Sequence, residues 1–287
     1  MKPAPFRYLA PTEVGEAVEL LREHGEGTKL LAGGQSLVPL MNLRLAQPSV
    51  LIDLNGVRGL TGIGERDGRV AVGAMARHGV VASDPIVGAR CPILARAAGQ
   101  IGYPAIRNRG TIGGSLAHAD PVAEMPCVAL ALDAELVALG PAGERVIPAS
   151  AFFDGLFQST LAPTEVLTEI RFPVIEENDG WGFEEFARKT GDYAICASAV
   201  TIRIANGVVQ RARIALAGVS DRPVRASAAE ALLVGRPPDT RSRAGAVEAV
   251  TSTVEHDGGH QAAGYRAHLA GVLTGRALSA AGFGGGA

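Results

Sequence analysis

The order of apolar and polar residues predicts alternating helix and strand in the first part of the chain. Residues 14–21 carry apolar side chains at helical spacing, with Thr12 as the expected N-cap and Gly25 as the helix stop. Short apolar runs of the kind that form strands occupy residues 28–32, 50–54 and 70–73. The helix and the first two runs indicate a small α/β lobe, which we expect to cover residues 1–55.

The next part of the chain combines helix start and stop signals with strand-like runs. Asp84-Pro85 predicts a helix start, because proline at the first helical position lacks only an N–H that has no helical partner there, and Pro92 predicts a break. A further helix is expected over 122–132, with Asp120 as its N-cap. Strands are expected at 136–139 and 145–147, joined by the turn 140–143, and at 166–172. We assign residues 56–175 to a second, α+β lobe.

The last part of the chain predicts a sheet followed by helices. A polar run at 176–180 indicates a boundary, and 182–188 is strand-like. Asn206-Gly207 marks a hairpin, because it separates alternating apolar and polar residues at 197–203 and 208–216. Helical patterns follow at 226–234, 243–254 and 262–278. We therefore expect a third domain over residues 176–287.

Composition describes a globular protein and excludes two classes of partner. The 287 residues are 47% hydrophobic and 20% charged, and the net charge is −2. So small a net charge gives no basic footprint for nucleic acid, and no apolar run is long enough for a transmembrane segment. The segment from Met1 to Pro5 lacks the apolar region of a secretion signal. We expect a cytoplasmic protein.

The residue types that carry metals or covalent catalysis form no recognisable set. Cys91, Cys127 and Cys196 are widely separated and make no C-x-x-C pair, so an iron–sulfur cluster or structural zinc held by this chain alone is not expected. We expect each cysteine to be a small buried hydrophobe. The six histidines show no metal-ligand spacing. We assign no catalytic residue and no metal ligand.

Two glycine pairs, far apart in sequence, share one pattern. They lie in Leu31-Ala32-Gly33-Gly34-Gln35-Ser36-Leu37 and in Thr111-Ile112-Gly113-Gly114-Ser115. Adjacent glycines in an ordered loop permit positive φ or the close approach of a ligand to the backbone, and bare N–H groups beside hydroxyls suit phosphate oxygens. Neither loop has the Rossmann or P-loop spacing. Glycine pairs also occur in plain turns, but two such loops can hold one diphosphate from two sides, which suits a dinucleotide in a cleft.

Four motifs occur in order along the chain and resemble those of one family. They are Ala32-Gly33-Gly34-Gln35-Ser36, Thr111-Ile112-Gly113-Gly114-Ser115, Asp120-Pro121 with Glu124, and Lys189-Thr190-Gly191-Asp192-Tyr193-Ala194. Together they resemble the flavin-binding medium subunit of molybdenum hydroxylases, the enzymes of the xanthine dehydrogenase and aerobic carbon monoxide dehydrogenase type. The resemblance implies an α+β chain: a two-lobed FAD-binding fold of the PCMH / vanillyl alcohol oxidase type, followed by a C-terminal α+β domain (antiparallel sheet with helices).

The resemblance also implies that FAD is the cofactor and gives roles to particular residues. Glu124 would hydrogen-bond a ribose hydroxyl, Tyr193 would lie beside the isoalloxazine, and Lys189 would stabilise negative charge on the reduced flavin. From the residues alone, Tyr193 is a strand-edge tyrosine, Lys189 a solvated lysine, and Asp120 as much a helix cap as a ligand contact. The full set of expected FAD contacts is Leu31, Ala32, Gly33, Gly34, Gln35, Ser36, Leu37, Ile101, Thr111, Gly113, Gly114, Ser115, Asp120, Glu124, Leu167, Lys189 and Tyr193.

In this family the flavin subunit works with partners. The resemblance implies an oxidoreductase in which a molybdopterin-containing large subunit feeds a [2Fe-2S] small subunit, and FAD on this chain passes the electrons to an external acceptor. A dimer of heterotrimers is expected. Two alternatives remain at this point: a free-standing FAD-dependent oxidase, which would need a substrate domain, and a non-redox nucleotide-binding scaffold.

Overall fold

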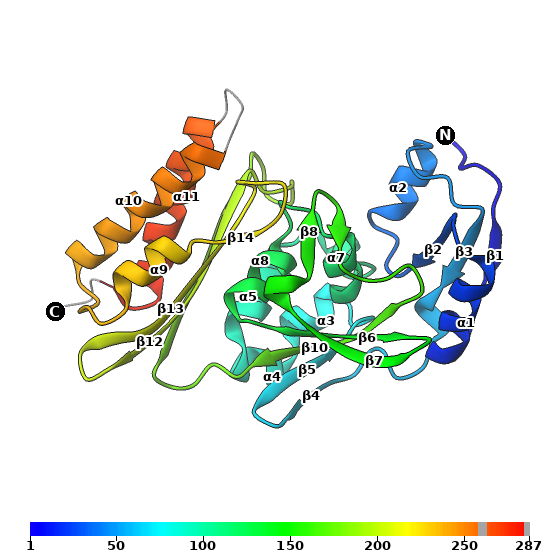
Figure 1. Cartoon of the computed structure of the whole chain (residues 1–287), viewed down its shortest axis with the longest axis horizontal. Coiled ribbons are helices and arrows are strands. Elements are labelled where there is room, and N and C mark those ends of the chain that lie inside the picture. Colours follow the sequence, from blue (N-terminus) through cyan, green and yellow to red (C-terminus); the bar gives the residue numbers. More distant parts are fainter. Residues whose placement is uncertain (258–262, 284–287) are drawn as a thin grey trace.

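The computed structural model describes residues 1–257 and 263–283. Figure 1 shows, from right to left, a small N-terminal sheet, a central sheet with its helices, and a C-terminal sheet backed by long helices. The first has three strands in the order β1-β3-β2, and the second five in the order β4-β5-β10-β6-β7. The third has four strands in the order β11-β12-β13-β14.

The N-terminal sheet is parallel and packs against one amphipathic helix. Its elements are β1 (Arg7–Leu9), α1 (Val14–His24), β2 (Thr28–Leu31), α2 (Leu37–Asn42), β3 (Val50–Asp53) and the 3-10 turn η1 (Leu54–Gly56). Helix α1 buries Ala17, Val18 and Leu21 against the sheet, as the spacing predicted. Gly25 ends the helix with φ of 56°, which confirms the predicted stop.

The predicted cap of this helix is wrong. Helix α1 begins after Glu13 rather than after Thr12. The carboxylate of Glu16 accepts hydrogen bonds from the N–H groups of Thr12 at 2.8 Å and Glu13 at 3.3 Å. A glutamate in the first turn therefore accepts hydrogen bonds from N–H groups at the helix start that lack a helical partner. A threonine cap is then not required.

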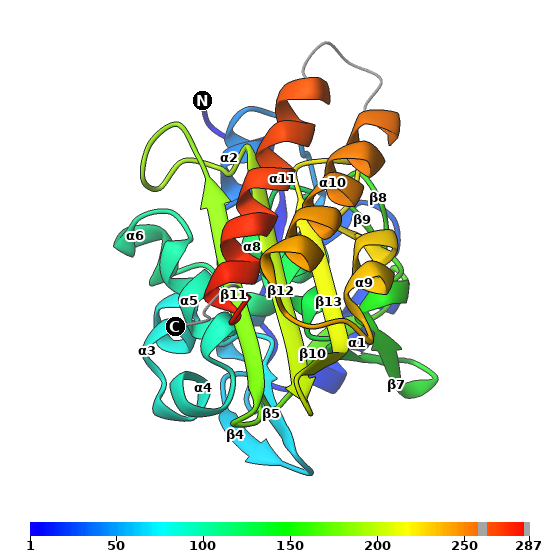
Figure 2. The ribbon, with the colours of Figure 1, turned by 90° about the vertical axis from the view of Figure 1, so that its left-hand side faces the viewer.

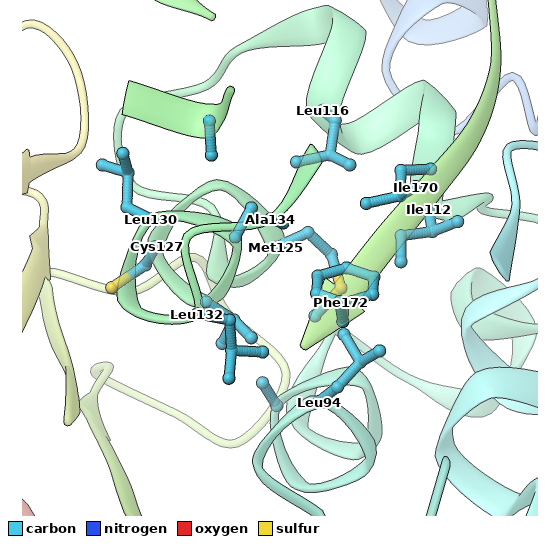
Figure 3. Close-up of a cluster of buried hydrophobic side chains, with 14 of the residues drawn as sticks. Leu94, Ile112, Leu116, Met125, Cys127, Leu130, Leu132, Ala134, Ile170 and Phe172 are labelled. Carbon is cyan, nitrogen blue, oxygen red and sulfur yellow. The ribbon is translucent and has the colours of Figure 1, made fainter. Parts of the chain in front are cut away.

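The central lobe is an antiparallel sheet covered by short helices. Its strands are β4 (Ile63–Arg66), β5 (Arg69–Gly73), β6 (Glu135–Gly140), β7 (Gly143–Pro148) and β10 (Val166–Pro173). Its helices are α3 (His78–Ser83), α4 (Pro85–Arg90), α5 (Pro92–Gln100), α6 (Pro104–Arg107), α7 (Ile112–His118) and α8 (Glu124–Ala131). Between β7 and β10 lie η2 (Ala149–Ala151) and the small ribbon β8 (Phe153–Gly155) and β9 (Gln158–Ser159). Figure 3 shows side chains of α5, α7, α8 and β10 converging in its core, among them Leu94, Leu116, Met125 and Phe172.

Two of the three proline and aspartate signals in this lobe are confirmed. Asp84 caps α4 by accepting from the N–H groups of Ile86 and Val87, and a new helix starts at Pro92. Asp120 does not cap the predicted helix, because α8 begins only at Glu124. Its Oδ1 accepts from the N–H of Val122 at 3.0 Å, which makes a turn ahead of the helix.

The C-terminal sheet is sandwiched between the central lobe and three helices. It comprises β11 (Asp179–Phe186), β12 (Cys196–Ala205), β13 (Val208–Ala217) and β14 (Val224–Arg225), followed by α9 (Ser227–Leu233), α10 (Thr240–Asp257) and α11 (Ala263–Ala280). The predicted hairpin and helices are confirmed, except that residue 262 lies outside the described residues. Strand β11 begins inside the run expected to be a break, because Asp179 pairs with Arg203 on β12.

The alternating pattern of the hairpin decides which side each helix layer covers. Small residues at one set of positions, including Ala197 and Ala199, pack into the central core beside α8. The intervening residues, including Val200 and Ile202, pack beneath the long helices that Figure 2 shows across the outer face of the sheet. Cys127 on α8 donates to Ala215 O at 3.3 Å, so the central and C-terminal lobes are in direct contact. All three cysteines are buried and unpaired, as expected.

The described residues contain neither a membrane-spanning helix nor a group of side chains that could hold a metal ion. Among residues 1–257 and 263–283, no helix combines the length and hydropathy of a membrane span. The same part of the chain contains no group of three or more histidine, cysteine, aspartate or glutamate side chains arranged to hold a metal ion.

Candidate functional site

The two glycine loops, about 80 residues apart in sequence, meet backbone to backbone. A Cβ at Gly33 would lie 2.3 Å from Arg109 O and 2.6 Å from Gly110 Cα. A Cβ at Gly114 would lie 3.3 Å from the Cβ of Ala32. Only glycine permits the first of these contacts, so the loops are built to lie side by side, as two halves of one cradle require.

The first loop presents a row of unpaired backbone donors. It turns at Gly34, whose φ of 74° is left-handed, and then enters the short helix α2. Gln35 Nε2 donates back to Gly33 O at 3.2 Å, which holds the turn. Within the described part of the chain, no acceptor is bonded to the N–H groups of residues 34–37. This loop fits the predicted phosphate cradle.

The second loop differs from the prediction, because Thr111 caps a helix and the glycine pair lies inside it. The N–H of Gly113 donates to Ala74 O at 2.8 Å, that of Gly114 to Thr111 Oγ1 at 3.1 Å, and that of Ser115 to Thr111 O at 3.0 Å. The expectation of bare N–H groups here is therefore wrong. Gly113 serves close packing instead, since its Cβ would lie 2.5 Å from that of Ala74.

The second loop still offers one donor to a ligand. The hydroxyl of Ser115 is half-buried and has no hydrogen-bond partner among the described residues. Helix α7 then ends at Ala119, in the left-handed conformation with φ of 53°, and the chain turns at Asp120 toward α8. Seven residues of helix span about 10 Å. Helix α7 therefore connects the glycine loops to a second group of expected contacts.

That second group centres on Glu124, in the first turn of α8. Only 9% of this residue is exposed, and burial, followed by the nearby carboxyl of Glu185, raises the pKa of Glu124 to about 8. Burial likewise raises the pKa of Glu185 to about 7, although Arg96 opposes the shift. One oxygen of Glu185 is buried without a partner in the described structure. The surroundings of Glu124 therefore favour its protonated form, which can both donate to and accept from a hydroxyl group.

The fourth expected motif, residues 189–194, closes this end of the site. Asp192 N donates to Lys189 O at 3.1 Å, and Gly191, at φ of 85°, lies against Tyr103, since a Cβ would be 2.9 Å from its ring. Tyr193 is 70% exposed. Partial burial, followed by the charges of Asp120 and Glu124, raises the pKa of Tyr193.

The remaining expected contacts, except Lys189, are half-buried or buried. Ile101 lies in the turn before Tyr103, where its carbonyl accepts from Arg107 Nη1 at 3.0 Å. Leu167 is 5% exposed and packs in the central core, at a β-bulge of β10. Leu31, Ala32, Ser36 and Leu37 are half-buried around the first loop, and Lys189 is exposed.

Sequence reasoning missed two residues that touch both loops. Asn55 donates to Ala32 O, and Arg77 donates to Asn55 and to Arg109 O. Nothing in the sequence singles them out, because each acts through backbone carbonyls that only the fold brings together.

The assembled groups fit FAD. Free N–H groups and a serine hydroxyl suit its diphosphate, a buried neutral carboxyl suits a ribose hydroxyl, and an exposed tyrosine suits an aromatic ring. The fit rests on the unpaired donors of residues 34–37 and on the uncharged state of Glu124. No catalytic nucleophile is needed, because the redox chemistry belongs to the cofactor.

Comparisons with known proteins agree. A family described as the FAD binding domain in molybdopterin dehydrogenase matches residues 4–175, and one described as the CO dehydrogenase flavoprotein C-terminal domain matches residues 181–281. The chain is 42% identical to the carbon monoxide dehydrogenase medium chain of Hydrogenophaga pseudoflava, over 98% of both chains. It is 40% identical to the 6-hydroxypseudooxynicotine dehydrogenase complex subunit alpha of Paenarthrobacter nicotinovorans, over 98% of this chain and 96% of the relative.

The fold is similar throughout. A solved structure of carbon monoxide dehydrogenase from Hydrogenophaga pseudoflava, lacking the Mo-pyranopterin moiety of the molybdenum cofactor, superposes with a TM-score of 0.94 at 44% identity, covering 98% of both chains. These matches confirm the expected fold class, cofactor and oxidoreductase class. The chain belongs to the family of FAD-binding medium subunits of the molybdopterin-dependent dehydrogenases.

Proposed function

We propose that this chain carries electrons from a [2Fe-2S] small subunit, through FAD, to an external acceptor. The small subunit is fed by a molybdopterin-containing large subunit, and the complex is a cytoplasmic dimer of heterotrimers. Bound FAD would supply reversible two-electron redox chemistry between the iron–sulfur partner and the acceptor. The chain's own residues bind the cofactor, orient it and set its surroundings.

The observation that carries this proposal is the meeting of the first glycine loop with the start of α7. The N–H groups of residues 34–37 and the Ser115 hydroxyl would bind the diphosphate. Glu124 would hold a ribose hydroxyl, and Tyr193, with Lys189, would lie beside the isoalloxazine. We propose the remaining expected residues as supporting contacts: Leu31, Ala32, Gly33, Ile101, Thr111, Gly113, Gly114, Asp120 and Leu167.

The proposed site draws on all three proposed domains. Residues 1–55 supply the first loop, 56–175 supply α7 and Glu124, and 176–287 supply the loop with Tyr193. Relatives of nearly equal identity are named for carbon monoxide and for 6-hydroxypseudooxynicotine, two chemically unrelated substrates. Because both relatives are named as parts of dehydrogenases, such similarity favours a role in the oxidation–reduction step over a role in recognising the substrate.

Rapid mixing of subunits tests the proposal. The purified chain with FAD should show the flavin absorption spectrum. Its flavin should stay oxidised when the large subunit's substrate is added without the other subunits. Adding the iron–sulfur and molybdenum subunits should bleach the flavin, and an external acceptor should restore its colour. Turnover of an organic substrate by the lone chain would favour a free-standing oxidase. A purified chain that binds no flavin would favour a scaffold.

A further inference from the structure

Asn55 and Arg77 form a bridge between the carbonyl groups at the entrances of the two glycine loops. Asn55 Nδ2 donates to Ala32 O at 3.0 Å, and its Oδ1 accepts from Arg77 Nη2. Arg77 Nη1 donates to Arg109 O. Each acceptor carbonyl belongs to a residue immediately before a glycine of one loop. The bridge therefore spans the place where Gly33 packs against the second loop.

Both bridge residues are themselves held in place. Asn55 follows β3, where Asp53 Oδ1 accepts from the Asn55 N–H at 2.9 Å and from its side-chain amide. Tyr8 on β1 donates to the other oxygen of Asp53. Each hydrogen bond removes a rotational freedom of the amide, so Asn55 reaches the arginine in one orientation.

Arg77 is fixed from the side of the second loop. It forms an antiparallel β-bridge with Thr111, and the next residue, His78, donates its N–H to Gly110 O at 3.0 Å. The His78 ring is 4% exposed and packs on Gly110, where a Cβ would lie 2.8 Å from Cδ2. Burial, followed by the Arg77 charge, lowers the pKa of His78 to about 4, so this support stays neutral at physiological pH.

We propose that Asn55 and Arg77 are a positioning pair that sets the separation of the two FAD-binding loops. The inference rests on the proposed placement of FAD between these loops. One loop supplies the unpaired N–H groups of residues 34–37 and the other supplies the Ser115 hydroxyl. Donors on separate segments bind one diphosphate well only when their spacing is fixed before the ligand arrives, because ordering them on binding costs affinity.

A simpler role for Arg77 would be attraction of the diphosphate by its charge, as Arg109 lies nearby. Three single variants separate the two roles. Arg77→Met removes charge and bridge, Arg77→Lys keeps the charge but has no planar fork to reach two acceptors, and Asn55→Ala breaks the bridge without touching a charge. The fourth variant combines Asn55→Ala with Arg77→Lys.

The measurement is the dissociation constant of FAD for the full-length chain, stripped of flavin and titrated under conditions where every variant is folded. Because a hydrogen bond to a charged group and the preorganisation it supports are lost together, each single variant should bind FAD roughly tenfold more weakly. The double variant should bind FAD no more weakly than whichever of its two single variants binds FAD more weakly, since the two substitutions break the same bridge.

Hydrogen–deuterium exchange of the flavin-free chain gives a readout that a loss of charge would not produce. The hydrogen-bonded amides beside the two loops are those of Val38, Arg109 and Gly110. They should exchange faster in Asn55→Ala and Arg77→Lys, while the core strand β10 is unchanged. The matched control is Arg145→Met. Like Arg77, Arg145 joins a side-chain oxygen to a backbone carbonyl, here the Glu165 carboxylate at 2.6 Å and Thr160 O at 2.8 Å, but it lies on β7. Its FAD affinity should equal that of the wild type.

Wild-type affinity in Asn55→Ala and Arg77→Lys, with weak binding only in Arg77→Met, would overturn the positioning pair in favour of a charge effect. Unchanged loop exchange in the bridge variants would also overturn it. A wild-type chain that binds no FAD would overturn the proposed function itself, and so the two failures are distinguishable.

Discussion

Glu124 is a buried carboxyl group in the first turn of α8 that no cation of the described residues neutralises through an ion pair. Its environment therefore favours the protonated form, and burial raises its pKa to about 8. A protonated carboxyl can donate to one oxygen of a ribose and accept from another hydroxyl. The same environment makes the flavin-free chain sensitive to pH.

The first prediction follows from this pKa. From about 4.5 to about 8, the folded chain keeps a proton that the unfolded chain has lost, so Glu124 makes stability fall as pH rises through this window and has no further effect above it. Glu124→Gln is neutral at every pH and should flatten this dependence. At pH 8, the melting temperature of the flavin-free variant should exceed that of the flavin-free wild type. The difference should be about 2–4 °C for each kcal/mol by which the substitution raises the free energy of unfolding.

Melting curves at pH 5, 6.5 and 8 check this prediction, with the exposed Glu177→Gln as control. Some slope should persist in the Gln variant, because Glu185 also titrates, with a pKa raised by burial to about 7. If Glu124→Gln and wild type lose stability in parallel between pH 5 and 8, Glu124 is charged in the folded chain and the reasoning fails.

The second prediction concerns Tyr193, whose exposed ring is proposed to cover the isoalloxazine. Tyr193→Ala should weaken FAD binding only several-fold, since an aromatic contact contributes about 1 kcal/mol. The flavin absorption spectrum and the rate of reoxidation by small acceptors should change more clearly. Ser115→Ala should give the reverse, with weaker retention and an unaltered spectrum. Unchanged spectrum and reoxidation in Tyr193→Ala would leave the tyrosine as packing only.

At the scale of elements, the glycine pairs have two different purposes. In the first loop, Gly34 turns the chain and the following N–H groups remain free. In α7, Gly113 and Gly114 are helical, and the absence of side chains lets the helix approach Ala74 and Ala32. One glycine pair thus binds through its backbone, while the other brings a helix close enough for its serine to reach the same ligand.

The third prediction tests the contact between these elements. Gly33→Ala places a Cβ 2.3 Å from Arg109 O. The nearest atoms are backbone atoms of residues 109 and 110, so no flexible side chain can move aside to make room. Overpacking of this kind costs about 1–3 kcal/mol, so FAD affinity should fall roughly tenfold or more while the chain stays folded. Gly15→Ala in α1 is the control, because its Cβ meets nothing within 4 Å. It should keep full FAD affinity, and an equal loss in both variants would argue against the loop contact.

Local signals in the sequence located most of the helices and strands. They did not show which side chains would form the hydrogen bonds at the helix ends. Asp84-Pro85 and Pro92 act only on neighbouring residues, and their predictions are confirmed. Thr12 and Asp120 failed as caps because Glu16 pairs the N–H groups in one case and α8 starts later in the other. Helix α7 was missed because a helix containing a glycine pair is stabilised by packing in the folded core rather than by propensity.

The residues of the candidate site also fall into two groups. Some are revealed by local sequence signals, and others only by contacts between distant parts of the chain. The motif around Gly33 and Gly34 is visible in the sequence because its special backbone is local. No sequence signal reveals Asn55 and Arg77, since their partners lie 22 to 32 residues away and are two backbone carbonyls and each other's side chains. The raised pKa of Glu124 likewise depends on burial and on Glu185, which only the packing of β11 near α8 provides.

At the scale of the whole molecule, each of the three sheets, with its own helices, supplies part of one line of proposed FAD-binding groups. The proposed line runs from the first glycine loop, along α7, to Glu124 at the start of α8 and to Tyr193. The C-terminal sheet is tied to this line by hydrogen bonds from Cys127 to Ala215 O and from Gly218 to Pro121 O. A ligand bound along the line therefore contacts all three parts of the chain and stabilises their arrangement by mass action.

The fourth prediction is the most direct test of the central claim, and it is a crystal structure of the full-length chain with FAD. The account predicts diphosphate oxygens within hydrogen-bond distance of the N–H groups of residues 34–37 and of the Ser115 hydroxyl. It also predicts a ribose hydroxyl on Glu124 and the isoalloxazine beside Tyr193. An FAD molecule whose diphosphate is bound away from the meeting point of Gly33 and Gly110 would contradict it.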